Sequence, residues 1–166
     1  MSALAEFVAS FAKTGRIGPL RVGMEATGLS AALADLGLAF EPPPERAEFA
    51  ARFESLEVSV SEGRVILLGL DHDGDLVLSV PPSLLDAPAS EGSRLARSEM
   101  VKALSRADCA WAVDAALTFP GHQSAIRTAI GASLVFAAPD LDVTEPDAVP
   151  DEEYLASIYM SFARGT

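Results

Sequence analysis

The stretch DHDGDLVLSV, residues 71–80, concentrates side chains that can bind a metal ion or transfer a proton, with three aspartates and a histidine ahead of an apolar alternation. A calcium-binding EF-hand loop starting at its first aspartate would need glycine at position six and a carboxylate at position twelve. Those positions hold Leu76 and Pro82, so the loop is too short to wrap a calcium ion. Asp73-Gly74 between two β-like runs instead predicts a hairpin, because a type I′ turn requires positive φ at both central residues.

Histidine and cysteine, the usual residues of zinc sites and nucleophilic catalysis, are scarce. His72 and His122 both fall in predicted turns, and neither belongs to an HxH, HxxxH or HExxH pattern, so a zinc site would require the two turns to meet in space. Cys109 is the single cysteine, and no histidine lies near it in the sequence to act as its base. We expect exposed turn histidines, a packed cysteine, and neither a metal nor a cofactor.

Carboxyl groups are the remaining candidates for catalysis. General acid–base chemistry requires one that is desolvated enough to keep its proton near neutral pH. Asp114, in CAWAVDAALTF, and Glu57, in LEVSV, are the two acids inside apolar strand-like segments. We expect both on solvated strand faces, although Trp111 and Phe119 are placed to line a pocket. No GxSxG, P-loop or GxGxxG pattern is present, so we assign no catalytic residues.

The formal net charge of −12 over 166 residues is the strongest property of the composition. It repels phosphate backbones and anionic lipid headgroups, so we expect no nucleic acid and no membrane partner. A basic protein partner is the complement of such a surface, although the acidity is also explained simply by solubility. The segment 139–153 holds seven carboxylates and no basic residue, and we predict that it is an exposed, irregular loop.

This acidic segment and the tyrosines that follow it are the predicted partner-binding region. Carboxylates would steer a basic partner during the encounter, and buried aromatic side chains would then anchor it. A homodimer is also compatible with the composition. The predicted contact residues are Asp140, Asp142, Glu145, Asp147, Asp151, Glu152, Glu153, Tyr154 and Tyr159.

Helices are predicted where apolar residues recur at helical spacing. The first follows Ser2, which can cap it, and ends at Gly15. The second has an apolar stripe of leucines and ends at Gly37, and the third runs over about residues 94–107. Residues 44–53 are a further candidate for a short helix, because proline is accepted at the first helical position.

Strands are predicted from apolar alternation and turn residues. The run 64–70 is apolar on both faces, so we expect it in the middle of a sheet and covered on each face. Residues 154–163 fit a helix or a strand, and we favour the strand. The other strands are predicted at 56–60, 76–80, 110–118, 124–130 and 133–137.

The order of a helix followed by three strands occurs twice, in two halves at 16–80 and 94–138. We therefore predict the α+β class, with a mostly antiparallel sheet covered by helices, in a single domain over residues 1–166. The N-terminal stretch lacks the basic leader of a signal peptide, and no apolar run is long enough to span a membrane. These features predict a cytoplasmic protein.

Three parts of the sequence carry a resemblance to known proteins: RIGPLRVGM with LADLG, SLEVSVSEGRVILLGLD, and CAWAVDAALTFPGHQSAIRTAIGASLVFA. They resemble blocks of a group of small actinobacterial proteins that are often found near polymorphic toxins and are regarded as immunity-like. The resemblance covers most of residues 16–137, and because its motifs are mostly apolar residues and turn glycines, it implies a fold and supplies no catalytic residues. The chain departs from it in the proline-containing insertion at 41–46 and in the acidic segment 139–153.

Three functions remain open on the sequence alone. The leading one is a non-catalytic, immunity-like inhibitor that binds a basic toxin or enzyme. The second is a small enzyme of secondary metabolism, such as an isomerase or cyclase, whose sheet and helices enclose an apolar cavity. The third is an assembly or regulatory module that acts through a sheet edge or a dimer face.

Overall fold

The computed structural model describes residues 2–41, 48–86, 92–139 and 152–162. The helices are α1 (Ala3–Thr14), α2 (Leu29–Asp35) and α3 (Arg97–Arg106), with short 3-10 turns at Ala26–Gly28, Pro82–Leu84 and Ala115–Leu117. The strands are β1 (Arg16–Ile17), β2 (Leu20–Arg21), β3 (Phe49–Phe53), β4 (Leu56–Ser61), β5 (Arg64–Asp71), β6 (Trp111–Val113), β7 (Gln123–Thr128), β8 (Ser133–Ala137) and β9 (Tyr154–Ser161).

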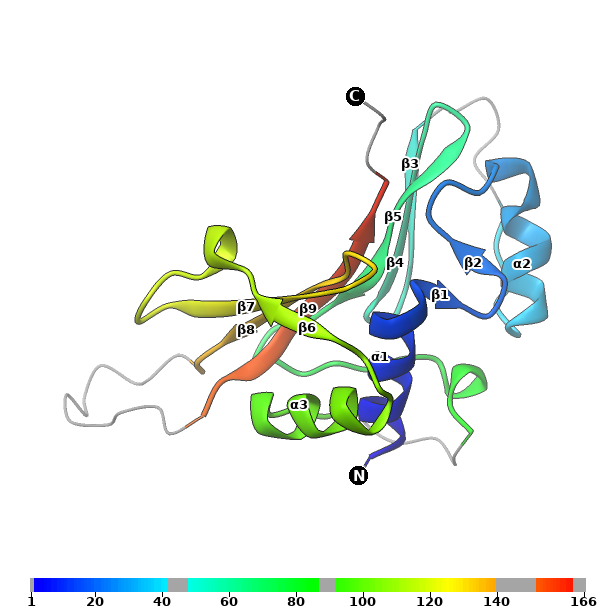
Figure 1. Cartoon of the computed structure of the whole chain (residues 1–166). Helices are drawn as coiled ribbons and strands as arrows, with labels where there is room; N and C mark the ends of the chain where they lie inside the picture. The colour runs from blue at the N-terminus through cyan, green and yellow to red at the C-terminus, as the bar shows by residue number, and fades with distance from the viewer. Residues whose placement is uncertain (1, 42–47, 87–91, 140–151, 163–166) are drawn as a thin grey trace.

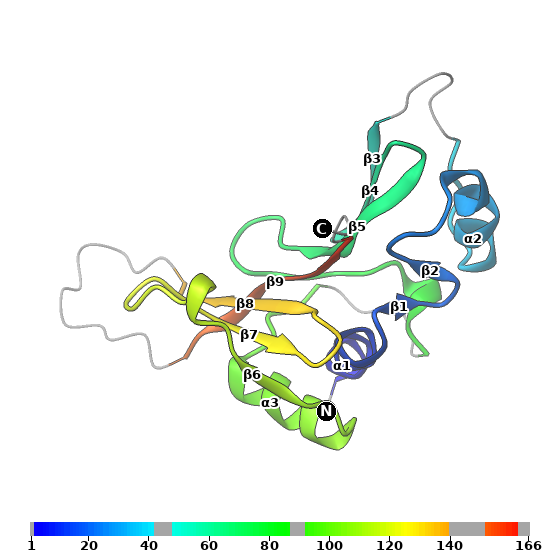
Figure 2. The same cartoon turned by 45° about the horizontal axis from the view of Figure 1, so that its top comes forward.

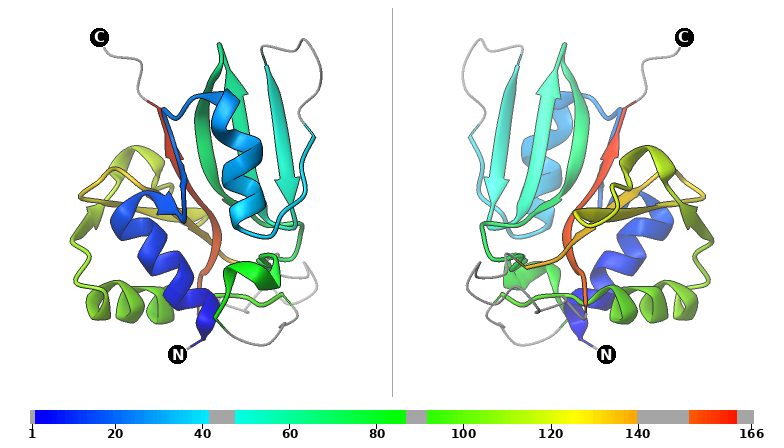
Figure 3. Two further views of the ribbon diagram at one scale, coloured as in Figure 1. Left: turned by 90° about the vertical axis from the view of Figure 1, so that its right-hand side faces the viewer. Right: turned by 90° about the vertical axis from the view of Figure 1, so that its left-hand side faces the viewer.

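A seven-stranded antiparallel sheet in the order β3-β4-β5-β9-β8-β7-β6 forms the centre of the fold, and β1 and β2 pair in a small sheet beside it (Figure 1). Figure 3 shows α1 and α2 on the same side of the large sheet. The α+β class with an antiparallel sheet and covering helices is therefore confirmed. None of the helices in the described ranges is long and apolar enough to cross a membrane.

Two three-stranded meanders, β3-β4-β5 and β6-β7-β8, flank the last strand, β9. Figure 2 shows β9 between β5 and β8, where it joins the meanders into one sheet. The strand predicted over residues 154–163 is confirmed, and its apolar residues Leu155, Ile158 and Met160 are buried. A strand that comes late in the sequence thus forms the middle of the sheet.

The first helix follows its sequence signals. The Ser2 hydroxyl accepts a hydrogen bond from the Ala5 N–H at 3.1 Å, and Gly15 ends the helix with φ of 69°. The Thr128 hydroxyl of β7 donates to the Ala12 carbonyl at 2.8 Å, so α1 is tied to the sheet by a buried hydrogen bond as well as by apolar packing. Phe11 of α1 belongs to the same apolar core as the sheet residues.

The third helix begins at Arg97, later than predicted, because the residues ahead of it pair with the start of β9. The Leu155 N–H donates to the Leu95 carbonyl at 2.8 Å, and the Arg97 N–H donates to the Glu153 carbonyl at 2.9 Å. This pairing continues the sheet beyond the last residue of β5 and fixes the direction in which the chain enters β9.

The short helix predicted at 44–53 is wrong over its described part, where residues 49–53 form β3. Phe49, Ala51 and Phe53 alternate toward the core and pair with β4, so a period of two outweighs the proline signal. Residues 42–47 lie outside the described ranges.

The predicted hairpin at 71–80 is also wrong. The free edge of β5 is occupied by β9, and Leu78 instead forms an isolated bridge with Ser93. The tight turn lies two residues later than expected, at Asp75-Leu76, which have φ of 52° and 59°. The apolar alternation of residues 76, 78 and 80 is real, because all three side chains are buried.

β5 is in the interior of the sheet, as predicted, but its two faces are not both covered. Leu68 and Leu70 are buried on the face that the helices cover, whereas Leu67 on the other face is only half-buried and Gly69 has no side chain. We call the helix-covered side the inner face and the opposite side the outer face. The predicted strand 110–118 is shorter than expected, because β6 ends at Val113 and a 3-10 turn follows it.

Candidate functional site

Acidic residues from three separate segments lie toward one end of the large sheet. In this antiparallel arrangement β4 begins and β5 ends at the same end, where Leu56 pairs with Leu70. β9 begins three residues further out, because Asp71, the last residue of β5, pairs with Ser157. Acidic residues lie in the β3–β4 turn, directly after β5 and directly before β9. We define the acidic end of the sheet as Glu54, Asp71, Asp73, Asp75, Glu152 and Glu153.

One arginine holds the first two of these segments together. The Arg52 guanidinium donates to the Glu54 carbonyl at 2.9 Å and to the Asp71 carbonyl at 3.0 Å, and it forms an ion pair with Asp73. The side chains of Arg52 and Asp73 are 40% and 59% exposed. An exposed pair of this kind adds little stability, but the backbone contacts fix the turn positions.

A second arginine connects the turn after β5 with the start of β9. The Arg94 Nε donates to the Asp75 carbonyl at 2.6 Å, and its guanidinium lies 5.5 Å from the ring centroid of Tyr154. The hydroxyls of Ser98 and Ser124 donate to the carboxylates that precede β9. The acidic end therefore carries six carboxylates, and Arg52, Arg94 and Arg97 lie beside them, so its formal charge stays negative.

The described members of the predicted contact region do not all lie together. Glu152, Glu153 and Tyr154 lie together at the acidic end, whereas Tyr159 lies further along β9, opposite Gly69 and Ser133. The remaining predicted residues lie outside the described ranges; they are Asp140, Asp142, Glu145, Asp147 and Asp151.

A hollow of about 230 Å³ on the outer face connects the acidic end with Tyr159. Glu57, Asp71 and Tyr159 line it together with Gly69. A Cβ atom at Gly69 would lie 2.3 Å from the Ile158 carbonyl oxygen, so only glycine fits beneath the hollow. Two carboxylates and an aromatic ring thus face a space large enough for one basic side chain.

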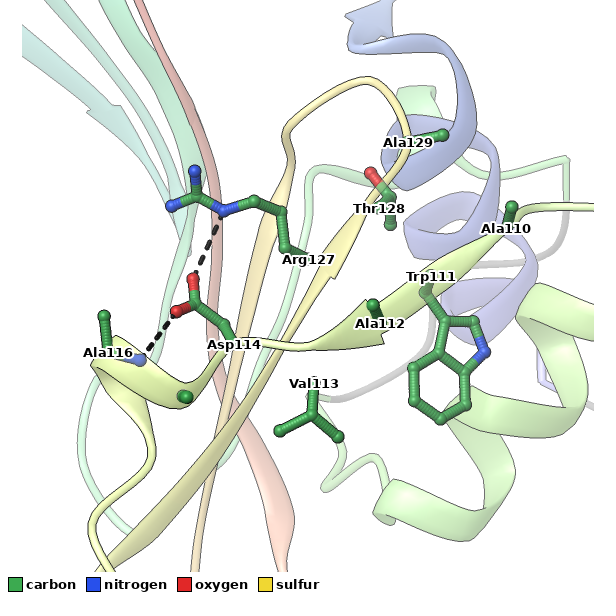
Figure 4. Close-up of a pocket in the computed structure, with 10 residues that line it drawn as sticks. Ala110, Trp111, Ala112, Val113, Asp114, Ala116, Arg127, Thr128 and Ala129 are labelled. Carbon is green, nitrogen blue, oxygen red and sulfur yellow. Dashed lines mark hydrogen bonds and ion pairs between the residues drawn. The ribbon is translucent and has the colours of Figure 1, made fainter.

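An open groove of about 610 Å³ follows the edge strand β6 (Figure 4). Trp111 and Val113 line it, and the Val113 side chain is 61% exposed. Because β7 is the only strand paired with β6 in the described sheet, this edge is open to solvent. Phe119 does not line the groove, although it too is exposed.

Asp114 is not on a solvated strand face, and that expectation is wrong. Its side chain is 9% exposed, one carboxylate oxygen accepts a hydrogen bond from the Ala116 N–H at 3.1 Å, and the other pairs with the Arg127 Nε at 3.2 Å (Figure 4). Asp114 thereby caps the 3-10 turn after β6. Because both oxygens already have donors, the carboxylate holds local structure rather than standing ready to transfer a proton.

The remaining candidates for chemistry are not assembled into a site. His122 is exposed, and the Nδ1 of the half-buried His72 accepts a hydrogen bond from the Gly74 N–H at 3.2 Å. Cys109 is buried, and this burial raises the pKa of its thiol above the ordinary value, which favours the unreactive protonated form. In the described part of the chain, no group of three or more histidine, cysteine or acidic residues is placed to hold a metal ion.

Comparison of the chain with protein-family models, with curated proteins and with solved structures gave no match. Any proposed function must therefore be argued from the geometry and charge of the residues described above. Sequence reasoning missed the contribution of Glu54, Asp71, Asp73 and Asp75 to one surface. The available signal was their position in turns, but the shared end of the sheet follows only from the strand order.

Proposed function

We propose that this protein is a non-catalytic binding protein, an immunity-like inhibitor whose acidic end captures a basic toxin or enzyme. The observation that supports the proposal most is that six acidic residues from three distant segments lie toward the same end of the sheet. Complementary charge across an interface accelerates the encounter and rejects acidic competitors. The resemblance to immunity-like proteins favours the same function.

Anchoring of the partner would follow the encounter. Tyr154 lies at the acidic end, against Arg94. The hollow on the outer face offers Glu57, Asp71 and the Tyr159 ring to a lysine or arginine side chain. Aromatic rings next to charged groups are the residues that most often dominate binding energy. The acidic segment between β8 and β9, whose ends are in place at residues 139 and 152, would add further charge.

The experiment uses three forms of the protein as bait in a lysate of the source organism. They are the natural protein, the acidic-end variant E54Q/D71N/D75N, and the control variant E6Q/D35N/D108N. The carboxylates of Glu54, Asp71 and Asp75 make no hydrogen bond or ion pair with the described residues, so neutralising them leaves the fold intact. Each variant loses three negative charges, and only their position differs.

We expect one basic protein to be enriched on the natural protein and on the control variant. The acidic-end variant should retain roughly tenfold less of it, because steering and charge pairing are lost together. The captured amount should also fall as sodium chloride is raised from 50 to 500 mM. Equal capture by both variants, or capture that does not depend on salt, would contradict the proposal.

A second candidate function, a small enzyme such as an isomerase or cyclase, is favoured by the groove along β6. The groove has the volume of a small-molecule site, and Trp111 provides an apolar wall beside the nearly buried Asp114. Native mass spectrometry of protein purified from its source organism tests this alternative. A retained small molecule that is lost in the variant W111A would favour the enzyme over the inhibitor.

A further inference from the structure

A hollow of about 420 Å³ lies at the other end of β5, away from the acidic end. Two arginines line it, Arg21 at the end of β2 and Arg64 at the start of β5. Glu25 and Thr27, from the connection between β2 and α2, complete its polar lining. Two arginines thus line one open space in a chain whose formal net charge is −12.

The backbone fixes one of these arginines. The Arg64 guanidinium donates to the Gly23 carbonyl at 2.8 Å, the Gly23 N–H donates to the Val65 carbonyl at 2.7 Å, and the Val65 N–H donates to the Met24 carbonyl at 3.0 Å. Gly23 has φ of 85°, and a Cβ atom there would lie 3.1 Å from the Phe162 ring. The loop is therefore held against β5, and it orients a guanidinium with donors left over for a ligand.

Arg21 is placed where its charge is unfavourable without an anion. It lies directly opposite Arg16 in the pairing of β1 with β2. Like charges directly opposite each other in an antiparallel pair destabilise it. Two ion pairs form between described residues, Arg52 with Asp73 and Arg127 with Asp114. Arg16, Arg21 and Arg64 take part in neither.

We propose that this hollow binds the phosphate group of a small-molecule ligand, held by the guanidiniums of Arg21 and Arg64 and by the Thr27 hydroxyl. A planar guanidinium fork matches phosphate oxygens, and charge-assisted hydrogen bonds are about twice as strong as neutral ones. Glu25 opposes the anion, because its carboxylate lines the same space. The hollow is distinct from the acidic end, so this inference does not depend on the proposed function.

The test is a titration of the whole isotope-labelled protein with inorganic phosphate, followed by NMR at constant ionic strength. We expect saturating shifts of the amides of residues 21–28 and Arg64. The variant R21Q should weaken binding roughly tenfold, since one charge-assisted contact is lost. The phosphate affinity of the variant R21K should lie between those of R21Q and the natural protein. The variant E25Q should bind phosphate more tightly, because a repelling charge is removed.

The matched control is K102Q, which removes one exposed positive charge on α3 and should leave phosphate binding unchanged. Acetate, titrated in parallel, separates a phosphate site from a general carboxylate site and should shift the same amides only weakly. Shifts that do not saturate, equal shifts with acetate, or an equal loss of binding in K102Q would overturn the proposal. R21Q is the preferred variant, because the side chain of Arg64 also supports the fold through Gly23.

Discussion

Leu68 and Gly69 are neighbours in β5, yet they face opposite sides of the sheet and have opposite roles. On the inner face, Leu68 pairs with Met160 and is fully buried beneath the helices. On the outer face, Gly69 pairs with Tyr159 and lines an open hollow. Alternate residues of the same strand thus face the core and the outer face, so the outer face can carry charge and hollows without weakening the core.

The largest effect expected from this comparison is on the inner face. Leu68→Ala should lower the free energy of unfolding by about 2–5 kcal/mol, because it leaves a cavity in the packed core. Leu67→Ala, the same change one residue earlier on the outer face, should cost less than half as much. Urea denaturation of both variants measures the difference. Equal losses would show that the outer face is packed as tightly as the inner one.

Gly69→Ala should have the next largest effect, about 1–3 kcal/mol, because the added methyl group collides with β9 backbone atoms. Gly63→Ala is the matched control, since Gly63 has no atom within 4 Å of the added Cβ and suffers only from its φ of 75°. Thermal unfolding of both variants gives the comparison. A Gly69→Ala protein as stable as the control would mean that β5 and β9 are less closely paired than described.

Asp114→Ala tests the structural role of a charged residue at the edge of the sheet. We expect a loss of about 1 kcal/mol, because the 3-10 turn loses its cap and Arg127 loses its partner. Arg127→Gln keeps the cap, and its effect should be smaller because the Arg127 side chain is 58% exposed. Denaturant midpoints measured side by side would contradict this assignment if Arg127→Gln were the more damaging change.

The smallest effect concerns pH and the buried thiol. Because burial raises the pKa of Cys109 above its ordinary value of 9.0, the unfolded chain loses the thiol proton first as the pH rises. Cys109 therefore has no pH-dependent effect on stability below about pH 9, and stability falls as the pH rises from there through the folded pKa. Cys109→Ala should remove this loss. Unfolding curves for the natural protein and the variant that stay parallel from pH 7 to 10.5 would contradict it.

Local signals in the sequence predicted those elements whose structure depends on neighbouring residues. The first helix follows from Ser2, Gly15 and the apolar residues between them, and β9 follows from the alternation of Ile158 and Met160. The prediction of a hairpin at 71–80 was wrong because β9, which is far away in the sequence, occupies the edge of β5. No local pattern encodes that competition between strands.

The candidate site was less predictable than the fold for the same reason. Glu152, Glu153 and Tyr154 were predicted from charge and composition, whereas Asp71 and Glu54 belong to turns far away in the sequence. Only the strand order brings these turns to one end of the sheet. The nearly buried position of Asp114 also depends on a contact with Arg127, which lies on a different strand.

We propose that the position of the carboxylates at the acidic end, and not the total negative charge, determines association with a basic partner. Stopped-flow association rates with the captured partner, at 20 and 300 mM sodium chloride, test it most directly. We predict that E54Q/D71N/D75N slows association at low salt by roughly tenfold, while E6Q/D35N/D108N changes it by less than about twofold. Equal slowing by the two variants would contradict the claim.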